Sequence, residues 1–170
     1  MAGIVDAPRG FQPIKSFGGE VGRINSYELA AANALLGKWD LVNQTAAGVI
    51  DRAAASDVNI IGACATNAAA SAATEFFPIY DDPYQIFLCQ SDSADVDADT
   101  DRNINYNIVV VAAVNGVSQM ELDGDSGATT NTLPLKLLNI HRQTGNTYGA
   151  NVACEVIINN HVYSGNLAGV

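Results

Sequence analysis

The chain has 170 residues, a length that fits one domain with a sizeable hydrophobic core. Eighteen acidic residues against eight basic ones give a net charge of -10, which opposes binding to a phosphate backbone and excludes nucleic acid as the main partner. No apolar stretch approaches the length of a bilayer span, and no basic segment followed by an apolar run opens the chain. We therefore expect a protein without a membrane partner, made in the cytoplasm.

The segment 1–25 is rich in glycine and proline, which disfavours a helix. Two interpretations remain open: an extended arm that lies on a neighbouring surface, or an extended segment that packs on its own domain. We divide the chain into an extended N-terminal arm, 1–25, and a single β-rich domain, 26–170. The arm carries apolar side chains that a disordered tail would not need, at Ile4, Val5, Phe11, Ile14 and Phe17.

Short apolar runs with turn signals between them recur along the next part of the chain. Residues 28–36 favour a helix by composition but stay open between helix and strand, and residues 65–73 read as a loop or one helical turn. The repeated short runs predict an all-β fold, a small barrel or sandwich of short antiparallel strands. The runs predicted as strands are 37–42, 47–50, 59–64 and 86–89, the last preceded by a turn at Asp81-Asp82-Pro83.

A hairpin is predicted by the alternation from Ile104 to Val114, the dipeptide Asn115-Gly116 and the second run from Val117 to Leu122. Asn-Gly between two such runs favours a tight turn because both central residues must adopt positive φ.

The stretch from Leu133 to Tyr163 predicts two neighbouring strands that close a sheet. From Val152 to Ile158 every second residue is apolar, which is typical of a strand with one buried face.

Three cysteines, Cys64, Cys89 and Cys154, lie in apolar runs and are expected to be buried thiols. His141 and His161 could each serve a nucleophile, but no catalytic motif accompanies them. The sequence therefore predicts no enzyme activity, no cofactor and no metal site. The aspartates at 92, 95, 97, 99 and 101 fail the spacing of a helix-loop-helix calcium site, which favours a solvated acidic loop.

Three segments resemble the head decoration, or cement, proteins of tailed bacteriophages. The first is Asp6-Ala7-Pro8-Arg9-Gly10-Phe11. The second is Tyr80-Asp81-Asp82-Pro83, with Phe87 and Gln90-Ser91-Asp92 after it. The third runs from Pro134 to Asn139, through Gly149-Ala150-Asn151-Val152, to Asn159-Asn160-His161-Val162-Tyr163. The chain departs from this family in the alanine-rich run 29–36, where a more β-prone strand would be expected.

The resemblance implies a structural virion protein on the outer surface of the capsid, where it binds the major capsid protein and stabilises its lattice. It also implies a β-rich fold and self-association, usually as a homotrimer. The alternatives are a virion fibre or adhesin module that binds a cell surface and, third, a hydrolase that uses His141 or His161. The candidate partner-binding residues are Arg9, Phe11, Ile14 and Phe17 in the arm, and His161 and Tyr163 near the C-terminus.

Overall fold

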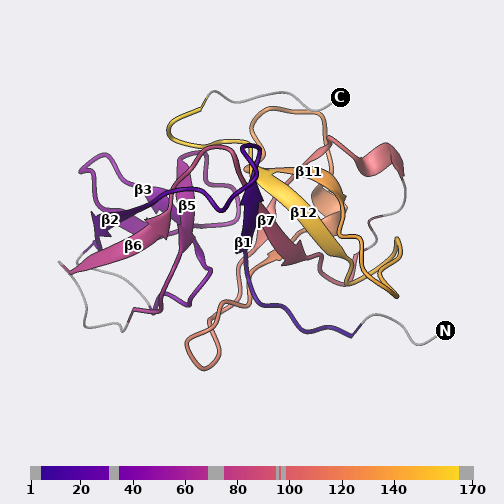
Figure 1. Cartoon of the computed structure of the whole chain (residues 1–170), viewed down its shortest axis with the longest axis horizontal. Helices are drawn as coiled ribbons and strands as arrows, with labels where there is room; N and C mark the ends of the chain where they lie inside the picture. The colour runs from indigo at the N-terminus through magenta and orange to yellow at the C-terminus, as the bar shows by residue number, and fades with distance from the viewer. Residues whose placement is uncertain (1–4, 31–34, 69–74, 95, 97–98, 165–170) are drawn as a thin grey trace.

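The protein is built from two five-stranded antiparallel sheets and a two-stranded hairpin (Figure 1). The structure is a computed structural model that describes residues 5–30, 35–68, 75–94, 96 and 99–164. Within these residues the only helical elements are two 3-10 turns, η1 (Asp99–Asp101) and η2 (Gly124–Ser126). The described residues contain no helix long and apolar enough to span a bilayer. The all-β prediction is therefore confirmed.

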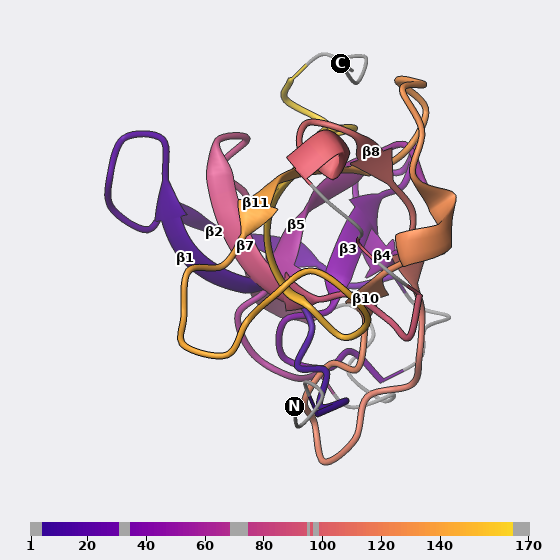
Figure 2. The same ribbon diagram turned by 90° about the vertical axis from the view of Figure 1, so that its right-hand side faces the viewer.

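The chain crosses between the two sheets several times, so that each sheet combines distant segments (Figures 1 and 2). The hairpin pairs β9 (Ile108–Val109) with β10 (Glu121–Leu122). The first sheet has the order β1 (Gln12–Ser16), β7 (Gln85–Gln90), β12 (Ala153–Ile158), β11 (Leu135–Ile140) and β8 (Asn105–Tyr106). The second has the order β2 (Ile24–Glu28), β6 (Phe76–Tyr80), β5 (Ile60–Cys64), β3 (Leu41–Gln44) and β4 (Ile50–Arg52).

The second sheet is covered by apolar side chains on both faces. One face joins the first sheet in a core that contains Leu41, Ile60 and Ala63 together with Phe87 and Val156. The opposite face supports a separate cluster of buried side chains, namely Leu29, Leu36, Val42, Ile50, Ile61, Cys64, Ala68, Phe77 and Ile79. Burial on two sides explains why β5 is apolar throughout instead of alternating.

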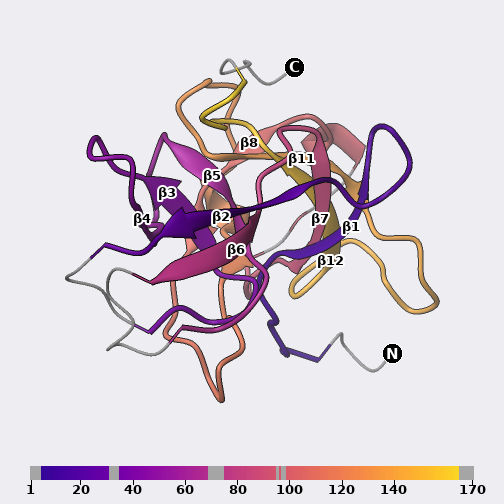
Figure 3. The ribbon, with the colours of Figure 1, turned by 60° about the vertical axis from the view of Figure 1, so that its left-hand side comes forward.

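The fold is a sandwich and not a closed barrel, which decides between the two predicted architectures. The ends of the edge strands β2 and β4 approach each other at one isolated bridge, between Leu29 and Ile50. No ladder of paired residues continues from that bridge in the described part of the chain. The second sheet therefore curls strongly without joining its two edges (Figure 3).

The predicted tight turn is confirmed, but the predicted long strand before it is wrong. Asn115 and Gly116 both have positive φ, 52° and 75°, and Val114 and Val117 exchange backbone hydrogen bonds of 2.9 and 3.0 Å. The run 104–114 is divided because β8 pairs with β11 in the first sheet, whereas β9 pairs with β10. Beyond Ile108 the hairpin projects from the body (Figure 1), and Val110, Val111 and Val114 are exposed.

The two C-terminal strands form the predicted antiparallel pair, in which Leu135 pairs with Ile158 and Leu137 with Val156. Cys154, Val156 and Ile158 point into the first core, while the residues between them are half-buried on the outer face of the sheet. The alternation predicted for this strand is confirmed. β12 then pairs with β7 on its other side, which places it at the centre of the first sheet.

Residues 12–16 and 24–28 of the chain supply β1 and β2, one to each sheet. β1 pairs with β7 and β2 with β6, so most of the described arm packs on its own domain. Contact of the arm with a neighbouring surface stays a prediction.

Candidate functional site

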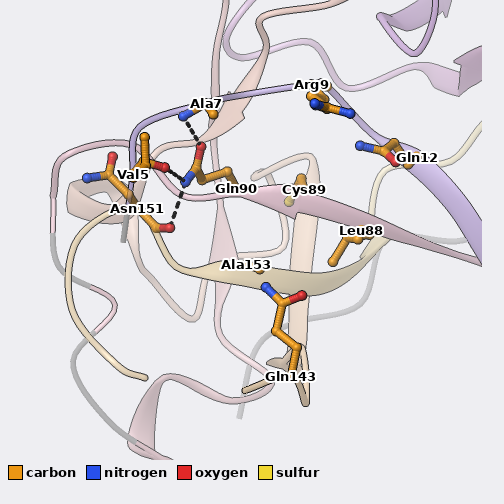
Figure 4. Close-up of a pocket in the computed structure, with 11 residues that line it drawn as sticks. Val5, Ala7, Arg9, Gln12, Leu88, Cys89, Gln90, Gln143, Asn151 and Ala153 are labelled. Atoms are coloured by element: carbon orange, nitrogen blue, oxygen red, sulfur yellow. Dashed lines mark hydrogen bonds between the residues drawn. The ribbon is translucent and has the colours of Figure 1, made fainter. Parts of the chain in front are cut away.

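The N-terminal segment crosses the outside of the first sheet, where Gln90 holds it (Figure 4). The Gln90 side-chain oxygen accepts a hydrogen bond from the Ala7 backbone N–H at 2.9 Å. Its amide nitrogen donates to the carbonyls of Val5 at 2.9 Å and Asn151 at 2.8 Å. One side chain at the end of β7 thus connects the arm, β7 and the loop before β12.

Gly10 turns the chain from this outer face into the core. Its φ is +68°, and a Cβ at this position would lie 2.3 Å from Cβ of Ser118. No other residue fits such a turn without moving its neighbours. Phe11 follows with its backbone N–H bonded to the Trp39 carbonyl at 3.0 Å and its ring fully buried in the first core. Phe11, predicted as a contact residue, is thus buried inside its own domain.

Arg9 stays outside and lines a pocket between the arm and the sheet (Figure 4). The pocket has a volume of about 240 Å³. Leu88, Cys89 and Ala153 provide its apolar part, and Gln12, Gln143 and Asn151 supply carboxamides. The side chain of Arg9 is exposed, so it remains a candidate contact residue.

Two aromatic rings form an exposed patch at the opposite end of β1. Phe17 is 62% exposed and Tyr84 is 61% exposed, and their ring centroids lie 6.4 Å apart in an edge-to-face arrangement. The Phe17 backbone N–H donates to the Tyr84 carbonyl at 3.2 Å. Together with Pro83 and Ile157 they border a hollow of about 280 Å³, which we call the aromatic patch. Ile14, also predicted as a contact residue, is half-buried on β1.

His161 and Tyr163 belong to a polar cluster around Asp81, whose side chain is fully buried. The Asp81 carboxylate accepts hydrogen bonds from Arg23 Nε at 3.0 Å, from Asn25 Nδ2 at 2.8 Å and from the hydroxyl of Tyr27. The Arg23 guanidinium carbon lies 5.2 Å from the centroid of the Tyr163 ring. Asp81 thus organises the junction between β2 and the C-terminal segment.

The C-terminal segment is attached to the second sheet by backbone and side-chain contacts. The Ile60 N–H donates to the Asn160 carbonyl at 3.1 Å, and the Val162 N–H donates to the Ile60 carbonyl at 3.0 Å. His161 is 2% exposed, and its Nδ1 accepts from the Tyr163 backbone N–H at 3.0 Å. Burial lowers the pKa of His161 to about 4, so the ring is neutral at pH 7.

His161 and Tyr163 differ in how far their rings are exposed to solvent. His161, predicted as a contact residue, is buried inside its own domain. Tyr163 is 49% exposed and remains a candidate contact residue. Burial, together with the hydrogen bond to the Asp81 carboxylate, raises the pKa of Tyr27, so its phenol keeps its proton and donates.

His141 directly follows β11 of the first sheet and lies beside Glu155 of β12. Its Nδ1 is 2.9 Å from Glu155 Oε1, and Lys15 Nζ is 3.1 Å from Glu155 Oε2. Partial burial raises the pKa of Glu155, but the hydrogen bonds from His141 and Lys15 outweigh it, so the pKa is lowered. These contacts bridge β1 and β12 on the outer face of the first sheet.

All three cysteines are free and buried, as predicted. Burial raises the pKa of Cys64 to about 11 and that of Cys154 to about 12, so both thiols keep their protons at pH 7.

The acidic loop forms contacts through two of its described members, Asp92 and Asp99. Asp92 Oδ1 accepts from the backbone N–H groups of Ala94 and Gly124, both at 3.1 Å. Asp99 forms an ion pair of 2.8 Å with Arg102. Asp95 and Asp97 lie outside the described residues. Among the residues that are described, no three His, Cys, Asp or Glu side chains are placed to hold a metal ion.

Sequence reasoning missed the structural importance of Gln90, Asp81 and Tyr84. Asp81 is the first residue of the predicted turn and Tyr84 directly follows it, and residues of such turns are expected to face solvent. Gln90 ends an apolar run, and a glutamine at that position carries no signal of its long-range hydrogen bonds.

Comparison with protein-family models, curated protein sequences and solved structures found no match.

Proposed function

We propose that this protein is a structural, non-enzymatic component of a virion. It binds the outer surface of the capsid, contacts the major capsid protein and stabilises the capsid lattice, and it associates with itself as a homotrimer. The observation that carries the proposal is the aromatic patch, because Phe17 combines a position predicted for partner contact with a largely exposed ring.

Exposed aromatic rings beside an apolar hollow are typical of surfaces that bind another protein. Phe17 and Tyr84 together with Pro83 and Ile157 provide the apolar part of such a surface, and Asn159 and Ser164 provide a polar edge. The two rings already contact each other, so little side-chain freedom is lost when a partner covers them. A rigid ring that fills a partner's pocket is also the side chain that most often dominates binding energy.

The arrangement of the three segments that resemble decoration proteins also supports the proposal. Gln90 from the second segment holds Ala7 of the first and Asn151 of the third. Asp81 of the second segment lies in the same cluster as Tyr163 of the third. The resemblance thus falls on residues of different segments that contact one another at both ends of β7.

Co-sedimentation with expanded capsids that lack a decoration protein tests the proposal. We expect the full chain to pellet with the capsids and the double variant Phe17→Ser, Tyr84→Ser to stay largely in the supernatant. Val58→Ser is the matched control, because Val58 is 47% exposed but lies outside the patch. Analytical ultracentrifugation of the free protein tests the trimer.

The outcomes separate the proposal from its rivals. No co-sedimentation of the full chain would overturn it. Binding to a glycan array without binding to capsids would instead favour the fibre or adhesin alternative. Equal pelleting by the full chain and the double variant would keep capsid binding but remove the aromatic patch from it.

A further inference from the structure

The outer face of the first sheet has a charge balance unlike that of the whole chain. The protein has 18 acidic and eight basic residues. The five strands of this sheet, by contrast, contain one acidic residue, Glu155, and two lysines, Lys15 and Lys136. The carboxylate of Glu155 is already engaged by Lys15 and His141. An anionic group is therefore repelled less here than elsewhere on this acidic protein.

The pocket beneath the arm adds a guanidinium to this face. Arg9 forms no ion pair with any residue in the described part of the chain. The side-chain carboxamides of Gln12 and Gln143 approach the same space from β1 and from the loop after β11 (Figure 4). Neither carboxamide has a hydrogen bond within the described residues, so both can turn toward a ligand.

The arm is fixed in place before any ligand arrives. Gln90 bonds the backbone at Val5 and Ala7, while the turn at Gly10 anchors the chain on the other side of Arg9. The backbone that carries Arg9 is therefore held at both ends, which reduces the entropy lost on binding. Arg9 also lies on the same outer face as Leu88 and Ala153, which give the pocket an apolar floor.

The size of this pocket and the side chains that line it indicate which class of ligand it can bind. A volume of about 240 Å³ suits one side chain with its adjoining peptide groups. No aromatic ring is among the residues that line the pocket, so a sugar or a nucleobase would find no ring to stack on. A guanidinium pairs best with a planar carboxylate, and carboxamides can bond both that carboxylate and a peptide backbone.

From this combination we infer that the pocket between the arm and the first sheet binds the side-chain carboxylate of an extended acidic segment of a partner protein. Arg9 forms the ion pair, Gln12 and Gln143 bond the segment's polar groups, and Leu88 and Ala153 contact its methylene groups. This inference goes beyond the proposed function, since it holds for a protein partner of any kind.

Titration of the isotope-labelled full chain, followed by NMR, tests the inference with small probes. We expect N-acetyl-glutamate N-methylamide to shift the side-chain amide signals of Gln12 and Gln143 at millimolar concentration. The uncharged N-acetyl-glutamine N-methylamide is expected to shift them far less. Arg9→Gln should weaken binding of the glutamate probe about tenfold, because it removes one charged hydrogen-bonding partner.

Arg102→Gln is the matched control, because it removes one positive charge outside the pocket and should leave the titration unchanged. Equal shifts with the two probes, no shifts with the glutamate probe, or undiminished binding by Arg9→Gln would each overturn the inference. Tighter binding of inorganic phosphate than of the glutamate probe would also overturn it. Because no capsid is used, the result is independent of the sedimentation experiment.

Discussion

The phenol oxygens of Tyr27 and Tyr163 lie 3.0 Å apart, although 136 positions separate the two residues in the chain. Tyr27 also donates to the buried carboxylate of Asp81, so this contact connects β2, the end of β6 and the C-terminal segment. The tyrosine pair depends on Asp81, since that carboxylate fixes the direction of the Tyr27 hydroxyl.

Replacing Asp81 should therefore destabilise the whole fold. Asp81→Ala removes the fully buried carboxylate that accepts hydrogen bonds from the exposed Asn25 and the half-buried Tyr27, and we expect a loss of about 2 kcal/mol in the free energy of unfolding. Urea unfolding followed by tryptophan fluorescence measures it. Glu20→Gln, at an exposed position, is the control and should change little. A loss below about 1 kcal/mol for Asp81→Ala would show that the cluster is not stabilising.

Acidification should weaken the fold through His161. The pKa of this ring is about 4 in the folded protein, against an ordinary value of 6.5, because the ring is buried. The unfolded chain therefore takes up a proton first as the pH falls, and the stability that is present above pH 6.5 is lost as the pH falls toward 4. Between pH 7 and pH 5 this linkage amounts to about 2 kcal/mol.

The comparison with His161→Phe isolates this contribution. Urea unfolding of both proteins across that pH range gives two slopes of stability against pH. Between pH 7 and pH 5 we expect the variant to lose about 2 kcal/mol less stability than the unmodified protein. Identical slopes would mean that the imidazole titrates normally in the folded protein.

The titration of Glu121 should lower the stability of the fold as the pH rises, which is opposite to the effect of His161. Its side chain is 9% exposed, and burial together with the carboxylates of Asp6 and Asp92 raises its pKa to about 7. The folded protein holds this proton more tightly than the unfolded chain, so stability decreases as the pH rises from the ordinary pKa of 4.5 through the folded pKa of about 7. Glu121→Gln removes the charge, and we expect it to stabilise the protein at pH 8 by about 1 kcal/mol and to have little effect at pH 5. Thermal unfolding at the two pH values checks both signs, and destabilisation at pH 8 would contradict the prediction.

Gly10→Ala should disturb the arm and the core together. The added Cβ would meet both the side chain of Ser118 and the carbonyl of Trp39, 2.6 Å away, in a left-handed conformation. We expect a loss of about 3 kcal/mol, measured by urea unfolding. Gly145→Ala is the matched control, because Gly145 also has positive φ, +85°, but open space around it. The control should lose only about 1 kcal/mol, from backbone strain alone.

Local signals in the sequence were sufficient where neighbouring residues decide the structure. The alternation from Val152 to Ile158 and the turn at Asn115-Gly116 depend on nearby side chains and on backbone preference, and both were predicted correctly. The run from Ile104 to Val114 alternates just as clearly, but it serves two different sheets, and only long-range pairing decides where it divides.

The candidate contact residues illustrate the same limit. Arg9 and Phe11 are two positions apart in a segment that reads as uniformly extended, yet one faces solvent and the other is buried. The difference comes from the turn at Gly10, whose requirement for glycine depends on Ser118 in a distant hairpin. The local sequence around Gly10 does not show that Ser118 lies against it.

The order of strands in the first sheet also has a consequence for how the protein folds. β7 lies between β1 and β12, which are separated by more than 130 positions, so the sheet cannot be completed until residues 153–158 have left the ribosome. A topology with so many distant pairings implies a high contact order and slow folding, on the order of milliseconds to seconds. During synthesis the apolar faces of β5 and β7 must wait for their C-terminal neighbours, so the nascent chain passes through an interval in which it is prone to aggregate.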